Sequence, residues 1–296
     1  MSVSVRLRAA TAVGAVGLLT LTACGTVSHV ASAAASQAAA LPANAAAVLG
    51  LASTQVDNAG SAKLSGTVKQ PGQTTTETVD GSISWGSSAE LQGDISGAQG
   101  ISQFSTTGQV PFAVVDGDMY LQVDAAAAAQ LQGKHWMKFD FAELAAASGS
   151  SQSANAASGL QGLLKQFSPV QSIRAIAKSP GVHAVGRETM DGVATTHFTG
   201  TVTLAQLVAA QSGITAAQAQ ALETADASVG FTGETIDVWL DAKNLPVRVE
   251  EQASTAKGDM VIDRHFSDYG VPVNVAVPPS SDTVDLAALL KAAKQG

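Results

Sequence analysis

The sequence has few of the residues that most often signal a particular chemistry. Among its 296 residues there is one cysteine, and only 4% are aromatic. One cysteine cannot form a disulfide within the chain, so an exported form must depend on its hydrophobic core for stability. The chain has no cluster of lysine and arginine, and its formal net charge is −8. Because phosphate binding needs clustered cations, these two features argue against nucleic acid as a partner.

The motifs of common enzymes are also missing. There is no GxSxG nucleophile elbow, no His-Glu-x-x-His pair and no glycine-rich phosphate loop leading to a lysine. The five histidines stand in separate segments without metal-ligand spacing, which favours solvated or core histidines over a metal site. Asp116 and Asp118 can be read as a carboxylate pair or as calcium ligands, but a turn is favoured because Asp bonds to local backbone. The sequence therefore predicts no catalytic residue, no metal and no cofactor.

The one long apolar run lies at the N-terminus. Arg6 and Arg8 precede an apolar stretch over residues 9–21, which is too short for a stable transmembrane span. The stretch ends in LTAC at residues 21–24, which resembles the lipobox of bacterial lipoproteins. The resemblance implies cleavage before Cys24, acylation of Cys24 and anchoring on the extracytoplasmic side of the cell membrane. The alternative is an ordinary signal peptide with an incidental cysteine, although the single cysteine stands where the motif requires it.

Composition divides the chain into four parts. Residues 1–23 are predicted to be the signal peptide, and residues 24–43, rich in Ala and Ser with almost no charge, a flexible tether. Residues 44–280 are predicted to be one folded domain that begins with a helix over 44–58. Residues 281–296 are expected to be a tail or a short helix.

Hydrophobic alternation with period two dominates the predicted domain. Residues 112–123 read as a hairpin around Asp116-Gly117, and Asp191-Gly192 repeats the signal between strands at 182–190 and 193–202. Further strands are expected at 63–68, 77–85, 89–95, 101–107, 235–241, 247–252 and 260–266. Helices are expected at 125–131, 169–178, 204–211 and 215–225, and apolar residues recur at helical spacing over 160–167. The pattern predicts an α+β fold built on an antiparallel meander.

Four motifs occur in order along this region. They are VDGDMY at 115–120, followed by Trp136; GRETMDG at 186–192, leading to TGTV at 199–202; IDVWLD at 236–241, followed by LPVRV at 245–249; and FSDYG at 266–270 before Pro278 and Pro279. This ordered set behind a lipobox resembles the mycobacterial LppX/LprA/LprF/LprG lipoproteins over roughly residues 45–279. The resemblance implies a LolA-like lipid-carrier fold, a curved antiparallel β half-barrel with helices covering the concave face around an apolar cavity. It also implies binding of acylated lipids or glycolipids for transport or presentation.

Burying an acyl chain gains about 0.8 kcal/mol per methylene group, so such a site needs an apolar groove rather than a polar anchor. Trp136 is the candidate for the entrance, whereas Trp239 alternates to the face opposite Ile236 and Val238. The alternative is a filled core in which the same side chains pack on one another. The candidate floor consists of Phe112, Val114, Met119, Leu121, Val123, Ile236, Val238, Leu240, Val247 and Val249, and the candidate lid of Leu160, Leu163, Leu164 and Phe167.

Two functions of different kinds follow. The first is a cell-envelope lipoprotein that binds an acyl lipid or glycolipid in an apolar cavity. The second is a membrane-tethered protein-interaction or sensor module with a filled core. The partners expected are the lipid and the membrane, contacted through the anchor on Cys24, together with an export or transfer partner that the sequence does not identify.

Overall fold

The computed structural model describes residues 41–86, 89–141, 143–144, 167–210, 219–220, 224 and 230–295. All of them belong to one unit of the chain, which runs from Leu41 to Gly296. Residues 24–40, which hold Cys24 and most of the predicted tether, lie outside the described residues. The predicted lid residues Leu160, Leu163 and Leu164 and most of the helix expected at 215–225 lie outside them too.

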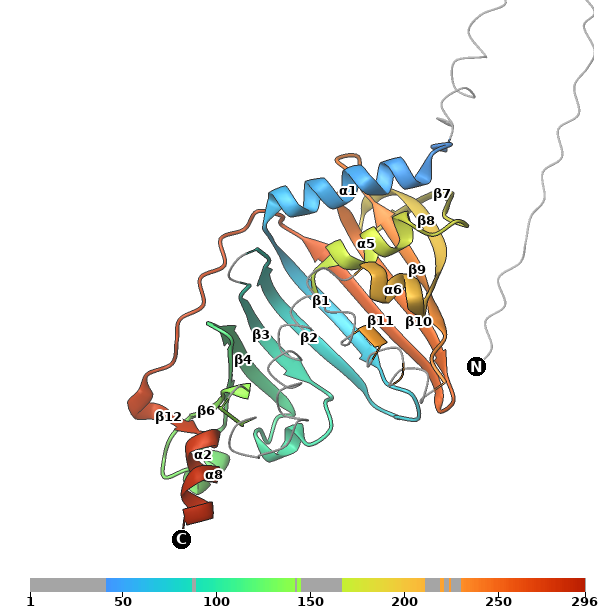
Figure 1. Cartoon of the computed structure of the whole chain (residues 1–296). Coiled ribbons are helices and arrows are strands. Elements are labelled where there is room, and N and C mark those ends of the chain that lie inside the picture. The colour runs from blue at the N-terminus through green and yellow to red at the C-terminus, as the bar shows by residue number, and fades with distance from the viewer. Residues whose placement is uncertain are drawn as a thin grey trace, which may run out of the picture. The chain divides into compact units, whose positions relative to one another are not determined.

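The described strands form a single twelve-stranded sheet, drawn in Figure 1. Its spatial order is β12-β6-β5-β4-β3-β2-β1-β11-β10-β9-β8-β7. The strands are β1 (Ser61–Lys69), β2 (Thr76–Ser84), β3 (Leu91–Ser96), β4 (Gln109–Val115), β5 (Asp118–Gln122), β6 (Trp136–Phe139), β7 (His183–Met190), β8 (Val193–Thr203), β9 (Gly233–Leu240), β10 (Pro246–Thr255), β11 (Gly258–Ser267) and β12 (Thr283–Asp285).

The sheet consists of two antiparallel meanders, β1–β6 and β7–β11. They join where β1 pairs with β11, which places Leu64 opposite Phe266. The exception to antiparallel pairing is β12, which lies parallel to β6 and extends the first meander. The predicted α+β class and antiparallel meander are confirmed, and the β1–β11 pairing turns two local meanders into one continuous curved surface.

Both predicted Asp-Gly hairpins are present. Asp116 and Gly117 have φ values of 56° and 84°, and Asp191 and Gly192 have φ values of 50° and 78°. Two successive positive φ values define the type I′ turn, whose twist matches that of the flanking strands. These turns fix the register, so Phe112 pairs with Leu121 and their side chains share one face of the sheet.

The described helices begin and end at residues suited to those positions. In α1 (Ala45–Ala59), the Asn44 side chain accepts a hydrogen bond from the Ala47 amide, and Gly60 follows the last turn with a φ of 72°. In α5 (Pro169–Ala177), Ser168 is the N-cap and Pro169 opens the first turn. The remaining helices are α2 (Ala125–Gln130), α6 (Leu204–Ala210) and α8 (Leu286–Gln295), with short 3-10 turns η1 (Ile101–Gln103) and η2 (Ser280–Asp282). Within the described part of the chain, no helix combines the length and apolarity needed to cross a bilayer.

Two segments differ from the prediction. The strand expected at 101–107 is instead the turn η1 and an irregular loop, bounded by Gly100 and Gly108 with φ values of 82° and 74°. The Thr107 amide donates to the Ser105 hydroxyl, a local bond that replaces a bond to a neighbouring strand. Conversely, Trp136–Phe139, which was not predicted as a strand, forms β6 by pairing with β5.

One pair of glycines brings two strands unusually close. Gly81 of β2 lies opposite Gly93 of β3. A Cβ on Gly81 would lie 2.1 Å from the Gln92 carbonyl oxygen, and a Cβ on Gly93 would lie 2.0 Å from the Asp80 carbonyl oxygen. Only residues without side chains allow such an approach, which is typical of strongly bent sheets. The pair also leaves two neighbouring positions between Leu64 and Phe112 without side chains.

Candidate functional site

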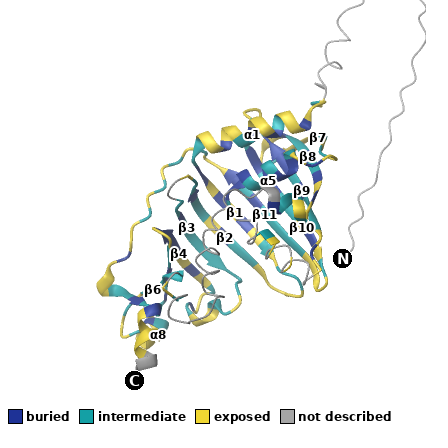
Figure 2. Ribbon diagram, in the orientation of Figure 1, coloured by how far each residue is buried: buried dark blue, intermediate teal, exposed yellow. Residues whose placement is uncertain are grey.

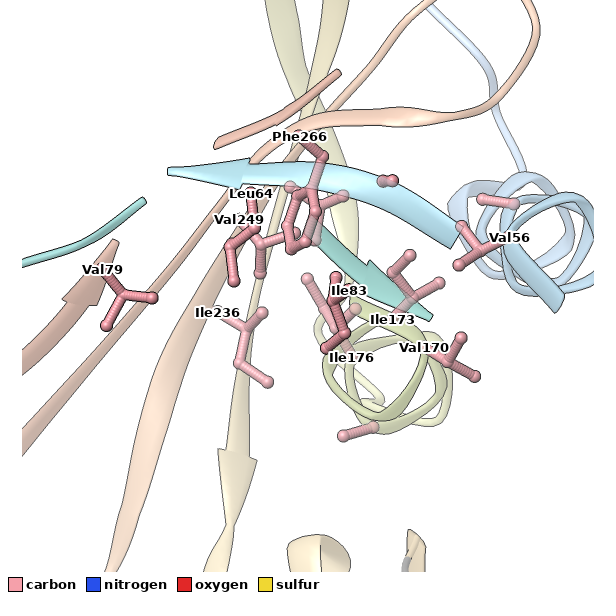
Figure 3. Close-up of a cluster of buried hydrophobic side chains, with 14 of the residues drawn as sticks. Val56, Leu64, Val79, Ile83, Val170, Ile173, Ile176, Ile236, Val249 and Phe266 are labelled. Atoms are coloured by element: carbon pink, nitrogen blue, oxygen red, sulfur yellow. The ribbon is translucent and has the colours of Figure 1, made fainter. Parts of the chain in front are cut away.

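One face of the sheet, here called the inner face, carries the large hydrophobic cluster and is packed by α1 and α5. Figure 3 shows the strand residues Leu64, Ile236, Val249 and Phe266 next to Ile173 and Ile176 of α5. Ile173, Ile176 and Ile236 are each 0% exposed. Helix α5 contacts the sheet mainly at β8, β9 and β10. Helix α6 contacts it mainly at β8 and β9. In Figure 2 the strands behind α5 are mostly buried or intermediate, whereas α1 is exposed along its solvent side.

The structure brings most of the described candidate-site residues onto this inner face. Met119 and Phe167 are partly buried and pack against the edge of the large cluster. Val123 and Val247 are buried but are not members of it. Val247 lies at a register shift between Pro246 and Arg248. The members of the large cluster are Phe112, Val114, Leu121, Ile236, Val238, Leu240 and Val249.

The predicted position of Trp136 at the entrance to the inner face is wrong. It packs with Val275 against a separate small cluster of Ala113, Val115 and Tyr120 on the opposite, outer face. In β6 the residue paired with Met119 is Phe139, so alternation directs Phe139 to the inner face and Trp136 to the outer face. Trp136 therefore does not lie at an entrance to the inner face, and the error follows from not recognising β6 as a strand.

The inner face also carries a charged cluster that the prediction missed. Arg264 of β11 is 1% exposed and is the one buried charged residue among the described residues. It donates a hydrogen bond to the carboxylate of Glu251 on β10, and to the Ser172 hydroxyl of α5 at 3.1 Å. The Ser172 hydroxyl donates to the same Glu251 oxygen. A buried guanidinium is tolerable only with such partners, because desolvation of an unpaired charge is costly.

Glu234 of β9 adds a second carboxyl group beside this pair. Burial, followed by the negative charge of Glu251, raises the pKa of Glu234 to about 8, while Arg264 acts in the opposite direction. Within the described part of the chain, no hydrogen bond or ion pair of the Glu234 side chain is seen to offset burial. Glu234 is therefore mostly protonated at pH 7 and can both donate and accept a hydrogen bond.

The sequence contains the signal for this cluster. Glu234 stands two residues before Ile236, Glu251 two residues after Val249, and Arg264 two residues before Phe266. A period of two puts each charged residue on the same face as its apolar neighbour. Charged residues in phase with the buried side of three strands were thus visible, but nothing local indicated that the three strands lie side by side.

The outer face of β7–β10 holds a second polar network, centred on His197. Its Nε2 atom is 2.7 Å from Asp237 Oδ1, and its Nδ1 atom is 3.0 Å from Glu188 Oε1. The imidazole stacks on Trp239 with ring centroids 4.3 Å apart. The Trp239 indole donates to Glu188 at 2.9 Å, which lowers the pKa of the Glu188 carboxyl group. Trp239 thus lies on the face opposite Ile236 and Val238, as predicted.

Arg248 extends the outer network onto β11. Its guanidinium carbon lies 4.6 Å from the centroid of the Trp239 ring, a cation–π contact. Two of its nitrogens donate to Asp263, at 2.8 and 2.9 Å, in a bidentate arrangement. These groups satisfy one another, so the network joins β7 to β11 on the side away from the helices.

Comparison with known proteins gives one relative above 30% identity and several distant structures. No family model matches the chain. It is 31% identical over 236 residues to the uncharacterized 31.2 kDa protein of the rplA–rplJ intergenic region of Streptomyces griseus, covering 78% of this chain and 75% of that protein. It is 28% identical over 177 residues to a Streptomyces coelicolor protein named "Putative lipoprotein", covering 60% of this chain and 50% of that protein.

Among solved structures, the chain is similar to LprF from Mycobacterium bovis, with 15% identity, a TM-score of 0.46 and coverage of 80% of this chain and 98% of that one. It is also similar to LppX from Mycobacterium tuberculosis, with 17% identity, a TM-score of 0.44 and coverage of 78% and 98%. Both are members of the lipoprotein group that the four sequence motifs resemble. The extent and identity of the Streptomyces griseus match show that this chain belongs to the family of that 31.2 kDa protein.

Proposed function

We propose that the protein is a membrane-anchored lipoprotein that holds the acyl chains of a lipid or glycolipid against the inner face of its sheet, for transport or presentation. The observation that carries the proposal is the extent of the apolar inner face. It continues from β8–β10, which α5 covers, onto Leu91, Phe112 and Leu121 of the first meander.

Binding an acyl chain requires apolar contact and no polar anchor. Each methylene buried contributes about 0.8 kcal/mol, so a single long chain supplies affinity from apolar contact alone. Gly81 and Gly93 support the proposal because they leave side chains out of the inner face between Leu64 and Phe112. Strand residues such as Met119 at the edge of the cluster are adaptable contacts for a flexible chain.

Membrane attachment through Cys24 belongs to the same proposal. The LTAC sequence at residues 21–24 matches the position and chemistry of a lipobox. The name of the Streptomyces coelicolor relative supports this assignment. Replacing Cys24 with Ser in the full chain is expected to release the protein from the membrane fraction of an actinobacterial host, while the wild-type chain stays in that fraction.

A second function is favoured by a different observation. Leu49, Ile173 and Val238 are all 0% exposed, which is what a filled core under α1 and α5 would give. A protein whose whole inner face is filled in this way would act as a tethered interaction or sensor module.

The experiment that separates the two functions starts from the soluble domain, residues 41–296, purified from bacteria. Lipid extracted from the pure protein is identified by mass spectrometry, and binding of a fluorescent fatty-acyl probe is measured after delipidation. Co-purified lipid and saturable probe binding are expected. Absence of both, in protein whose circular dichroism spectrum is that of a folded sheet, would leave only the interaction module.

A further inference from the structure

We propose that the solvent side of α1 is the surface through which the protein contacts the lipid bilayer. The inference rests on the membrane attachment in the proposed function, and it adds which face of the domain lies against the lipid headgroups. Three features carry it: the place where the chain enters the domain, the scarcity of charge along α1, and the exposure of apolar side chains on and beside this helix.

The chain from the anchor enters the domain at α1. Cys24 precedes Leu41, the first described residue, by 17 positions, and α1 begins four residues later at Ala45. A fully extended chain of 17 residues spans at most about 60 Å. Of the described elements, α1 is thus the first that the anchored chain reaches. Anchoring raises the effective concentration of the bilayer around the domain, so a contact too weak for a free protein becomes populated.

The segment that forms α1 has almost no charge. Asp57 is the one charged residue in the sequence between Leu41 and Ala59, and it is paired with Arg174 of α5. Residues 41–296 nevertheless contain all 24 acidic residues of the chain and only 14 of its 16 basic ones, because Arg6 and Arg8 precede them. Charged groups resist desolvation, and carboxylates are repelled by anionic lipid. The solvent side of α1 largely avoids both costs.

The two sides of α1 are clearly separated. Its buried residues, which face the sheet, are Ala45, Leu49, Ala52 and Val56. The 3.6-residue period places a second set on the opposite side, and all of its members are exposed: Ala47, Leu51, Thr54 and Asn58. In Figure 2 this solvent side of α1 is mostly exposed along the length of the helix. A helix of a soluble protein usually carries charged residues there, and α1 carries an alanine, a leucine and two uncharged polar residues.

Large apolar side chains are exposed on and beside this face. Leu51 is 57% exposed, the highest value for a large apolar side chain in the part of the chain that the structure describes. Leu41, just before α1, is 39% exposed. Strand β7 contacts α1 and carries Val185, which is 48% exposed. Insertion of such side chains among lipid headgroups removes apolar area from water, which is the driving force for interfacial helices.

The contact also sets the orientation of the inner face. Helix α1 packs against α5 and contributes Leu49 and Val56 to the inner-face cluster. In Figure 1 it lies across one end of the sheet. With α1 on the bilayer, this end of the apolar inner face lies beside the membrane. An acyl chain that moves between the bilayer and the protein then travels along α1, away from the charged network of the outer face.

The test uses the mature chain, residues 24–296, in which Cys24 is the single cysteine. Its thiol is coupled to a maleimide lipid in vesicles of phosphatidylcholine and phosphatidylglycerol in equal amounts, which reproduces the natural connection. The photo-crosslinking residue p-benzoylphenylalanine replaces Thr54 in one variant and Thr76 in another. Both positions are exposed, but Thr76 pairs with Lys69, at the end of β1 away from α1. After irradiation, lipid adducts are counted by mass spectrometry.

Lipid adducts are expected at position 54 and few at position 76. Adding Leu51→Glu should lower the yield at position 54 about tenfold, because it replaces an inserted leucine with a charge. The matched control Thr76→Glu should leave that yield unchanged. In the chain with a blocked thiol, which is not anchored, the yield should be low, and Ala47→Leu should raise it by adding apolar area to the same side of α1. Circular dichroism confirms that each variant is folded.

Equal lipid yields at positions 54 and 76, or an unchanged yield in Leu51→Glu, overturn the proposal. Adducts at position 54 that join two protein chains instead of protein and lipid also overturn it, since α1 would then be an interface between copies. The chemical link replaces acylation, so these failures leave the release experiment with Cys24→Ser unaffected. If Cys24→Ser stays in the membrane fraction, the proposed anchor fails, and the adducts still decide which face meets the bilayer.

Discussion

Both meanders of the sheet have alternating hydrophobic residues, but the side chains on their inner faces differ. In β1–β5 the side chains that join the large cluster are apolar, and Gly81 and Gly93 lie opposite each other with no room for a Cβ on either residue. In β7–β11 the inner face combines apolar residues with Arg264, Glu251 and Glu234. That meander also carries the helices α5 and α6 and the His197 network on its outer face.

For the proposed lipid-binding function, the difference separates two requirements. A smooth apolar surface that bends provides room for a chain, and nothing polar is needed there. A surface that must hold a helix in one position benefits from polar contacts, because hydrogen bonds and ion pairs are directional whereas apolar contact is not. On this interpretation the first meander is the chain-binding part and the second is the part that positions the helices.

The largest expected effect tests the bend in the first meander. Gly81→Val places a Cβ 2.1 Å from the Gln92 carbonyl oxygen, so β2 and β3 must separate. We expect a loss of about 4 kcal/mol or a failure to fold, measured by urea unfolding. Gly186→Ala in β7 is the control from the second meander, since nothing lies within 4 Å of the position that its new Cβ would take. A small effect of Gly81→Val would show that the bend does not depend on this glycine.

The next prediction compares the cores of the two meanders. Ile173→Ala under α5 should cost about 2–5 kcal/mol, because it creates a cavity in a filled region. Leu121→Ala should cost less, about 1–2 kcal/mol, if the first meander borders space that already exists. It should also weaken fatty-acyl probe binding, which Ile173→Ala should change less. Equal losses of unfolding free energy with no change in probe binding would remove the distinction between the meanders.

The third prediction concerns the pH dependence of the second meander. The pKa of Glu234 is raised by folding from 4.5 to about 8, so the folded state binds more protons than the unfolded state in this interval. Stability from this group is therefore fully present below about pH 4.5 and is lost as the pH rises to about 8. The slope is at most about 1.4 kcal/mol per pH unit. Urea unfolding of wild type and Glu234→Gln between pH 5 and 9 checks this, and the slopes should differ.

The smallest expected effect lies on the outer face. Trp239→Phe keeps a ring beside His197 and Arg248 but removes the indole donor to Glu188. We expect a loss of about 1 kcal/mol and no change in fatty-acyl probe binding, because the network faces away from the helices. A large loss of probe binding in this variant would contradict the assignment of the binding surface to the inner face.

How far the sequence predicts the structure depends on the range of the signal. The hairpins at Asp116 and Asp191 and the approximate bounds of α1 and α5 were predicted because each depends on a few adjacent residues. The strand β6 was missed because it is four residues long and owes its conformation to pairing with β5. That omission also misplaced Trp136 on the wrong face. The inner-face positions of Phe112, Ile236 and Val249 follow from alternation alone.

By itself the sequence determined the local turns, the helix ends and which side of each long strand is apolar, because steric limits on φ and the two-residue period of a strand act over short distances. Only the tertiary structure decided that β1 pairs with β11 and that Ser172, Glu251 and Arg264 meet on the inner face. Those contacts join residues that are far apart along the chain. Their partners are selected by the burial of the whole inner face and not by any neighbouring residue.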